Sequence, residues 1–199
     1  MPVKRKSKGF TLAEVMSYMG VLLIIILFAG TFVINSLKYY RLIDIETTLQ
    51  QRLLVSMSHI SHDLSVANRN SLQIEQNGMI FASPRNAAGG FSFASDGSLY
   101  WQKWVCYFIK NSGDDKILVK KEIPISSPSV DPGSPPFDTV SQFSGASVPE
   151  RKISDGVRTF TVENAGYAGG YKVSLLVDMT TDSTRLNQIQ GVTEILIRN

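Results

Sequence analysis

Hydrophobic and polar residues follow different periods in different parts of this chain, and the changes of period divide it into three regions. Residues 15–37 carry no charged side chain and include a continuous apolar run at 21–28. About 20 apolar residues in a helix span a hydrocarbon core of roughly 30 Å. The first pattern therefore predicts a transmembrane helix over residues 10–37.

The second region, residues 38–68, has an apolar residue at every third or fourth position. This spacing is typical of a helix with one apolar face. No proline lies between Pro2 and Pro84 to interrupt it. We therefore expect the helix to continue through residues 38–68, and residues 12–67 together would form a helix about 84 Å long at about 1.5 Å per residue. The residues of the stripe are Leu42, Ile45, Leu49, Leu53, Met57, Ile60, Leu64 and Ala67.

The third region, residues 69–199, has short apolar segments separated by turn residues, as in antiparallel sheets. Asn77-Gly78 is a strong two-residue hairpin signal, and a second hairpin is expected around Asp96-Gly97 and a third around residues 111–115. Residues 124–149 are rich in Ser and Pro, which predicts an exposed loop with a binding role. The fold class is therefore α+β, a long N-terminal helix packed on a mostly antiparallel β-sheet domain. The strands are expected at residues 72–76, 79–81, 91–93, 99–101, 104–109, 117–123, 157–162, 171–177 and 192–197.

Charge is concentrated before the apolar run. Lys4, Arg5, Lys6 and Lys8 account for four of the 20 basic residues, so the remaining chain has 16 basic against 17 acidic residues. By the positive-inside rule, this cluster predicts a cytoplasmic N-terminus and an extracytoplasmic domain. The apolar run is too long, and residues 34–37 are too poor a cleavage site, for an ordinary signal peptide.

The residual charge argues against a nucleic-acid ligand, because no later segment clusters basic and aromatic residues. The lone cysteine, Cys106, excludes an intramolecular disulfide. It lies within an apolar run and has no charged neighbour in the sequence to stabilise a thiolate, so we expect a buried, unreactive thiol.

Glu14 is the residue that a plain membrane anchor does not explain. A carboxylate carried to the centre of a bilayer costs about 2.5–3.5 kcal/mol, and its natural partner is a cation. With its neighbours Lys8-Gly9-Phe10-Thr11-Leu12-Ala13-Glu14-Val15, it resembles the prepilin motif of type IV pilins and type II secretion pseudopilins.

The resemblance implies a processing pathway and an assembly role. A prepilin peptidase would remove the basic leader, residues 1–9, by cutting after Gly9, and Phe10 would become an N-methylated N-terminus. Glu14 would neutralise the terminal amine of a neighbouring subunit, which is mostly cationic at neutral pH. Residues 10–37 would then serve as both the membrane anchor and the filament core, and residues 69–199 would form the periplasmic or extracellular domain.

Three further segments resemble a particular subclass. Residues 59–64, 104–109 and 196–199 are similar to the J-type minor pseudopilin of type II secretion and to the W-type minor pilin of type IV pili. The resemblance implies a structural subunit that helps to initiate a filament near its tip, with the inner membrane and other minor and major subunits as partners. The presence of Glu14 argues against the K-type pseudopilin, which typically lacks it.

Candidate chemistry elsewhere is sparse. His59 and His62 have helix-compatible metal-site spacing, but no further His or Cys pair completes the shell. Asp114-Asp115 and the pair Asp178 and Asp182 lack the spacing of a calcium loop. No catalytic or phosphate-binding motif is present. We therefore expect no enzymatic activity, no metal and no cofactor.

Two other interpretations stay open at this stage. The chain could be a membrane-anchored binding module whose sheet and 124–149 loop capture an exported protein, a surface or DNA. It could also be a plain single-pass protein with an accidental motif, which predicts an uncut N-terminus. The sequence does not distinguish a type IV pilus, a type II secretion pseudopilus and a DNA-uptake filament.

Overall fold

The computed structural model describes residues 11–76, 78–113, 115–182 and 185–197, without the side chains of residues 180–186. Contacts between residues divide the chain into two compact units, Met1–Ile45 and Glu46–Asn199. One helix, α1 (Leu12–Leu64), contributes to both. The predicted α+β class is confirmed, with a long N-terminal apolar helix packed on a mostly antiparallel β domain.

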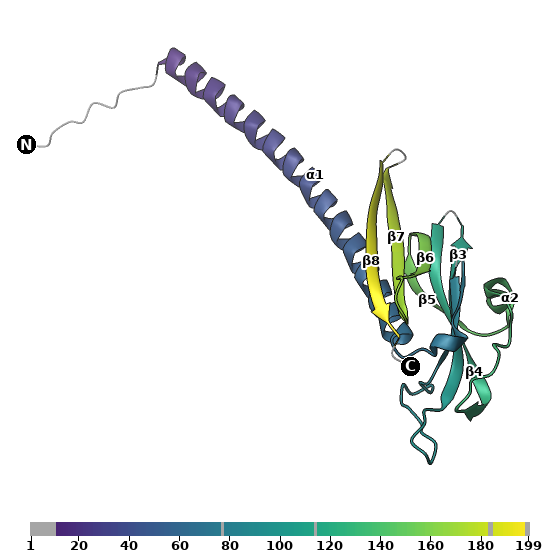
Figure 1. Ribbon diagram of the computed structural model, residues 1–199. Helices are drawn as coiled ribbons and strands as arrows, with labels where there is room; N and C mark the ends of the chain where they lie inside the picture. Colours follow the sequence, from purple (N-terminus) through teal and green to yellow (C-terminus); the bar gives the residue numbers. More distant parts are fainter. Residues whose placement is uncertain (1–10, 77, 114, 183–184, 198–199) are drawn as a thin grey trace, which may run out of the picture. The chain divides into compact units, whose positions relative to one another are not determined.

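The second unit contains two antiparallel sheets (Figure 1). The five-stranded sheet has the order β1-β2-β3-β4-β5, and the three-stranded sheet has the order β6-β7-β8. The strands of the first are β1 (Gln73–Glu75), β2 (Gly78–Ser83), β3 (Trp101–Ser112), β4 (Asp115–Ser129) and β5 (Glu150–Asp155). The strands of the second are β6 (Val157–Asn164), β7 (Gly170–Asp182) and β8 (Arg185–Leu196).

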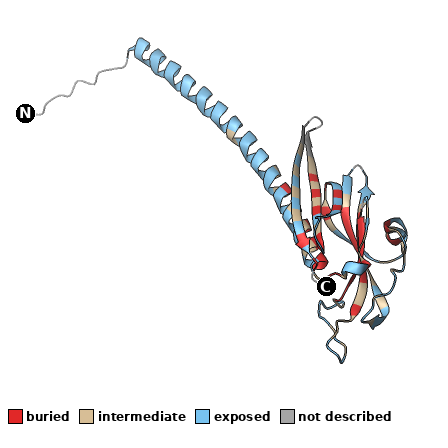
Figure 2. Cartoon of the chain, in the orientation of Figure 1, coloured by how far each residue is buried: buried red, intermediate tan, exposed pale blue. Residues whose placement is uncertain are grey.

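The centre of the five-stranded sheet is buried on both faces. One face packs with the short helix α2 (Val140–Gly145), where Phe143 is fully buried beside Trp104 and Cys106. The opposite face carries Phe81 and Tyr107, whose rings stack with centroids 6.4 Å apart. Burial on both faces explains the unbroken apolar run at 104–108, because no strand residue there faces water. Figure 2 shows this buried centre in red.

Several predicted elements are confirmed. The hairpins around residues 77–78 and 111–115 form as the β1–β2 and β3–β4 pairs, although Asn77 and Asp114 lie outside the described residues. The last three predicted strands correspond to β6, β7 and β8. Gly78 has a packing role besides its turn signal, because a Cβ there would lie 2.5 Å from the carbonyl oxygen of Tyr107.

The hairpin around Asp96-Gly97 is reduced to isolated bridges. Arg85 pairs with Phe91, and Phe93 pairs with Leu99, without a continuous ladder. The polar Ser92 and Ser98 between them bond through their backbones to Tyr100 and Ala94 respectively. The predicted strands 91–93 and 99–101 are therefore wrong as strands, except that Trp101 begins β3.

The expectation for residues 124–149 is wrong only about secondary structure, because most of the segment is exposed as expected. This segment is not one unstructured loop, because β4 continues to Ser129 and α2 forms at Val140–Gly145. Pro124 is tolerated because β5 pairs with β4 only at 117–121, so the later part of β4 has a free edge that needs no N–H. Thr139 caps α2 by accepting a bond from the N–H of Gln142 at 3.2 Å, and Phe137 packs edge-on against Phe143.

The helix ends at Leu64 rather than near residue 68. The N–H of Ser65 still donates to the carbonyl of Ser61, but the N–H of Ala67 donates to Leu64, three residues back, in the tighter pattern that closes a helix end. A short 3-10 helix, η1 (Arg69–Ser71), then leads into β1, with Asn68 as its cap. Ala67 remains buried, as the stripe predicts, but it lies in the turn after the helix.

Candidate functional site

The N-terminal end of α1 forms a capping box. The backbone N–H and the hydroxyl of Thr11 both donate to Glu14 Oε2, at 2.9 and 3.0 Å, and the N–H of Glu14 donates to Thr11 Oγ1 at 3.3 Å. Reciprocal bonds of this kind satisfy donors that the first turn of a helix leaves unpaired. The geometry gives Glu14 a role within the chain, as the residue that closes the start of the helix. Gly9 and Phe10 lie outside the described residues.

Large apolar side chains after Glu14 have no cover among the residues that the structure describes. Between Val15 and Phe32 their exposed fractions run from 46% to 73%. Within the described residues, α1 is the one helix long and apolar enough to cross a membrane. An exposed apolar surface of this extent indicates a lipid or protein environment, and the chain is to that extent compatible with a single-pass membrane protein.

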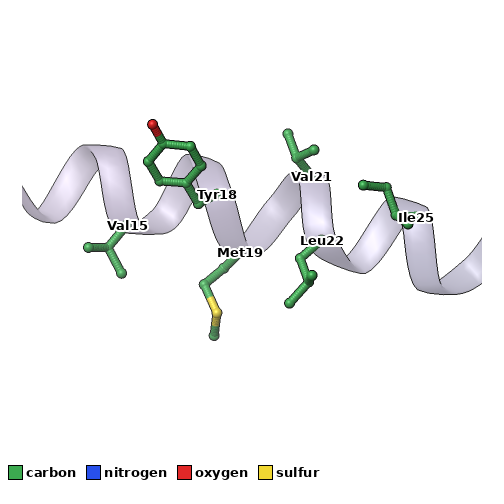
Figure 3. A pocket seen from close by; sticks show the side chains of 6 residues that line it. All are labelled: Val15, Tyr18, Met19, Val21, Leu22 and Ile25. Carbon is green, nitrogen blue, oxygen red and sulfur yellow. The ribbon is translucent and has the colours of Figure 1, made fainter.

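The surface of this segment has a shallow apolar groove. Figure 3 shows the six side chains that line it, with Val15, Met19 and Leu22 on one side of the helix and Tyr18, Val21 and Ile25 on the other. Ridges of side chains at spacings of three and four are the surfaces through which helices pack on each other. The groove therefore has the form of a helix-packing surface.

The aromatic residues after the apolar segment are also exposed. Tyr39 and Tyr40 follow Lys38 directly and are about two-thirds accessible. Tyrosine rings of this kind settle at a membrane–water interface. Their position in the sequence agrees with the expected end of the span at residue 37.

A second polar site, in the Glu46–Asn199 unit, was not recognised from the sequence. Asp63 lies at the end of α1, where its Oδ2 accepts from the Tyr107 hydroxyl at 2.6 Å and contacts Lys120 Nζ at 2.6 Å. Lys120 also contacts Glu122 Oε1 at 2.5 Å, and Lys103 Nζ donates to Glu122 Oε2 at 2.7 Å. These five residues, which we call the Asp63 cluster, join α1 to β3 and β4.

The protonation states of the Asp63 cluster follow from its burial and charge. Only 12% of the Asp63 side chain and 10% of the Lys120 side chain are exposed. Burial disfavours the Asp63 carboxylate, but the bonds from Lys120 and Tyr107 outweigh it and hold the pKa of Asp63 below its usual value. Burial, followed by the Asp63 charge, raises the pKa of Tyr107. The cluster thus combines a neutral phenol with two carboxylates and two ammonium groups, which are joined by three ion-pair contacts.

The other candidate residues do not converge on a site. His59 is half-buried and His62 exposed, and the described residues contain no group of three or more His, Cys, Asp or Glu able to hold a metal ion. Asp178 pairs with Arg158 at 3.1 Å. The predicted burial of Cys106 is confirmed, and burial raises the pKa of its thiol to about 12. The side chain of Asp182 and the whole of Asp114 lie outside the description.

A signal for the Asp63 cluster exists in the sequence, but it is weak. Asp63 directly precedes Leu64 of the apolar stripe, and Lys120-Lys121-Glu122 interrupts the apolar residues of the strand between Val119 and Ile123. Charged residues within such patterns are buried only when paired. Which acid meets which base depends on how the helix crosses the sheet, and that information is not local.

The chain was also compared with known proteins. It matches no family model, no curated protein and no solved structure.

Proposed function

We propose that this chain is a minor pilin or pseudopilin, a structural subunit of a type IV pilus or a type II secretion pseudopilus. A membrane peptidase removes residues 1–9, and Phe10 becomes the methylated N-terminus. The anchor lies in the inner membrane with its N-terminus in the cytoplasm, and the β domain lies outside. The subunit joins other minor and major subunits near the tip of the filament and helps to initiate its assembly.

One observation carries the proposal: the prepilin-like residues 8–15 lead directly into an uncovered apolar helix. Neither part is sufficient alone, because an uncovered apolar helix also describes any membrane anchor. Together they give a cleavage site, an acidic residue and an apolar surface in the order that a filament subunit requires.

The geometry of Glu14 supports its proposed partnership with a neighbouring amine. Both Thr11 bonds fall on the same carboxylate oxygen, Oε2. An ionised carboxylate has about four acceptor positions, so capping leaves it able to accept a charge-assisted bond. In a low-dielectric surrounding, an ammonium is a strong partner for it.

The apolar groove supports the second part of the proposal, the packing of neighbouring helices. Residues 15–25 offer two rows of side chains with a depression between them. A second apolar helix can seat its own ridge in such a depression. Lipid chains can cover the same surface before assembly.

The decisive experiment is the intact mass of the protein extracted from the membranes of its native host. We expect a mass lacking residues 1–9 and increased by one methyl group. A full-length mass in cells with an active prepilin peptidase would contradict the proposal and favour the membrane-anchored binding module.

A matched pair of variants then tests assembly separately from processing. Glu14→Gln keeps an oxygen that can accept the Thr11 bonds but removes the charge, whereas Glu14→Asp keeps the charge on a shorter side chain. We expect both to be inserted and cleaved, Glu14→Gln to be lost from sheared filaments, and Glu14→Asp to be retained in part. Normal incorporation of a processed Glu14→Gln protein would refute the charge pairing.

A further inference from the structure

Strand β8 forms an edge of the three-stranded sheet. It pairs with β7 from Leu196 back to Arg185, and within the described chain no strand pairs with its other side. Its register against β7 is unbroken between residues 188 and 196. An edge strand presents a row of backbone donors and acceptors that another strand can use.

The phase of the ladder shows which groups face outward. Leu196 of β8 lies opposite Gly170 of β7. In the next pair along the ladder, the N–H of Ile197 donates to the carbonyl of Gly169. Gly170 and Leu196 are therefore a non-hydrogen-bonded pair, and the odd-numbered residues of β8 exchange bonds with β7. The backbone groups of the even-numbered residues point away from β7. These are Gln188, Gln190, Val192, Glu194 and Leu196.

The other three edges of the two sheets, β1, β5 and β6, have protections that residues 187–196 of β8 lack. Strand β1 has only three residues, and β6 carries Arg158 and Glu163 and has a register shift in its pairing with β7. Strand β5 has six, of which four are charged, and its pairing with β4 contains a register shift. Residues 187–196 of β8 contain one charge, Glu194, and no proline. Charges, prolines, irregularities and short length are the usual protections of an edge against strand addition.

The surroundings of β8 leave room for an added strand. Val192 and Leu196 are 50% and 47% exposed on the outer face of the sheet. A hollow beside residues 193–196 is bordered by Ser61, Ser65 and Val66 near the end of α1. Addition of an extended peptide to an exposed sheet edge, with pockets for alternate side chains, is a recurring mode of peptide binding.

We propose that β8 binds an extended segment of a partner polypeptide as a fourth, antiparallel strand. The five outward N–H groups and five outward C=O groups of residues 188–196 supply the recognition. The partner segment carries an apolar or β-branched residue opposite Val192 and an amide or cation opposite Glu194. This site goes beyond filament assembly through α1.

A second copy of this chain is not the proposed occupant. Leu53 lies beside Gly191, and residues 61–66 lie beside residues 193–196, so α1 and β8 run in the same direction. Antiparallel pairing of two β8 strands would make the two α1 segments run in opposite directions. Chains anchored in one membrane share one direction, so this exclusion rests on the proposed function, whereas the open edge does not.

A peptide copying residues 188–196 serves as the probe. Antiparallel pairing centred on Val192 sets Val192 opposite its copy and Gln190 opposite Glu194, and uses every outward group. The peptide has no helix, so the direction of α1 does not restrict it. Binding of the labelled peptide to the full-length protein in detergent micelles is measured by fluorescence anisotropy.

The matched variants are Val192→Pro and Val192→Thr. Proline at 192 removes an N–H that points away from β7, so it blocks the edge without breaking the β7 ladder. Threonine keeps that N–H and the β-branched shape. We expect Val192→Thr to bind like the parent and Val192→Pro to bind at least about tenfold more weakly, a difference of about 1.4 kcal/mol.

A second measurement guards against a folding defect in Val192→Pro. The same peptide, N-methylated at its positions for residues 190, 192 and 194, is expected to lose binding to the unmodified protein. Equal binding by the Pro and Thr variants, or by the methylated peptide, would overturn the proposal, as would no saturable binding at about 1 mM peptide. A protein dimer, seen by light scattering, that dissociates in Val192→Pro would make a second copy the occupant and refute the heterologous strand.

Discussion

The two parts of α1 are both rich in apolar residues, but these side chains are exposed in the first part and buried along one stripe in the second. From Leu12 to Ile43, in the first unit, the large apolar side chains surround the helix and are exposed. From Glu46 onward, in the second unit, one stripe of apolar residues is covered: Leu49, Ile60 and Leu64 are almost completely buried, whereas Leu54 and Val55, outside the stripe, are exposed. Figure 2 shows the helix mostly in pale blue, with its red patches toward the C-terminal end.

The contrast shows that the spacing of apolar residues along a helix, more than their number, determines whether a single sheet can bury them. A stripe can be buried by one sheet, which leaves the polar side in water. A helix that is apolar all round cannot be satisfied by one surface and needs lipid or several neighbours. The stability of the β domain should therefore depend on the second part of α1 and not on the first.

The largest expected effect comes from matched truncations in the two parts. Ile60→Ala removes a fully buried side chain, and we expect it to lower the free energy of unfolding by about 2–5 kcal/mol. Ile24→Ala makes the same chemical change in the exposed segment and should shift that free energy by less than about 0.5 kcal/mol. Denaturant titration of the full chain in micelles, followed by the fluorescence of Trp101 and Trp104, measures both. Equal losses would contradict the contrast.

A smaller loss of stability is expected from a substitution in the Asp63 cluster, at the end of the apolar stripe. Asp63→Ala leaves the buried hydroxyl of Tyr107 without its acceptor and removes one of two anions from Lys120. We expect a loss of about 2–3 kcal/mol, limited because Glu122 still pairs with Lys120. The same titration measures it, with the exposed Asp138→Ala as the control. A loss no larger than that of the control would mean that the Asp63 cluster contributes nothing to stability.

The smallest effect is the dependence of domain stability on acid pH. The pKa of Asp63 is lower in the folded chain than its unfolded value of about 3.9, so the unfolded state binds more protons as the pH falls. This contribution is fully present above about pH 4 and is lost as the pH falls through the folded pKa. Glu122 acts in the same direction. The fall in unfolding free energy between pH 5 and pH 2 should be shallower in Asp63→Asn, and an unchanged slope would exclude Asp63 as a contributor.

Much of the fold could be predicted because its signals are local. The apolar run, the stripe ending at Ala67 and the Asn-Gly and Asp-rich turns each depend on residues close in sequence. Strand β5 was not expected, because Glu150, Arg151 and Lys152 look like a solvated loop and pair only at a sheet edge. Helix α2 was not predicted because it lies in a Ser- and Pro-rich segment, although apolar residues recur there at every third position, as Phe137, Val140 and Phe143.

The candidate sites also differ in how far their signals are local in the sequence. Glu14 stands out because it is a charge beside an apolar run, but its capping bonds with Thr11 were not anticipated, although the Thr-x-x-Glu spacing of a capping box is present. The Asp63 cluster joins residues more than 40 positions apart. The open edge of β8 depends on the order of strands, which no local pattern contains. Gly9, Phe10 and the proposed pairing of Glu14 stay predictions.

The burial of Cys106 makes its thiol a probe of how often the domain opens. This lone thiol lies at the middle of β3, flanked in the sheet by Ile80 and Lys121. A reagent that modifies thiols can reach it only when the strands around it separate. The rate of modification in native conditions would therefore report how often the centre of the sheet opens, and comparison with global unfolding would show whether the sheet opens alone or only with the whole domain.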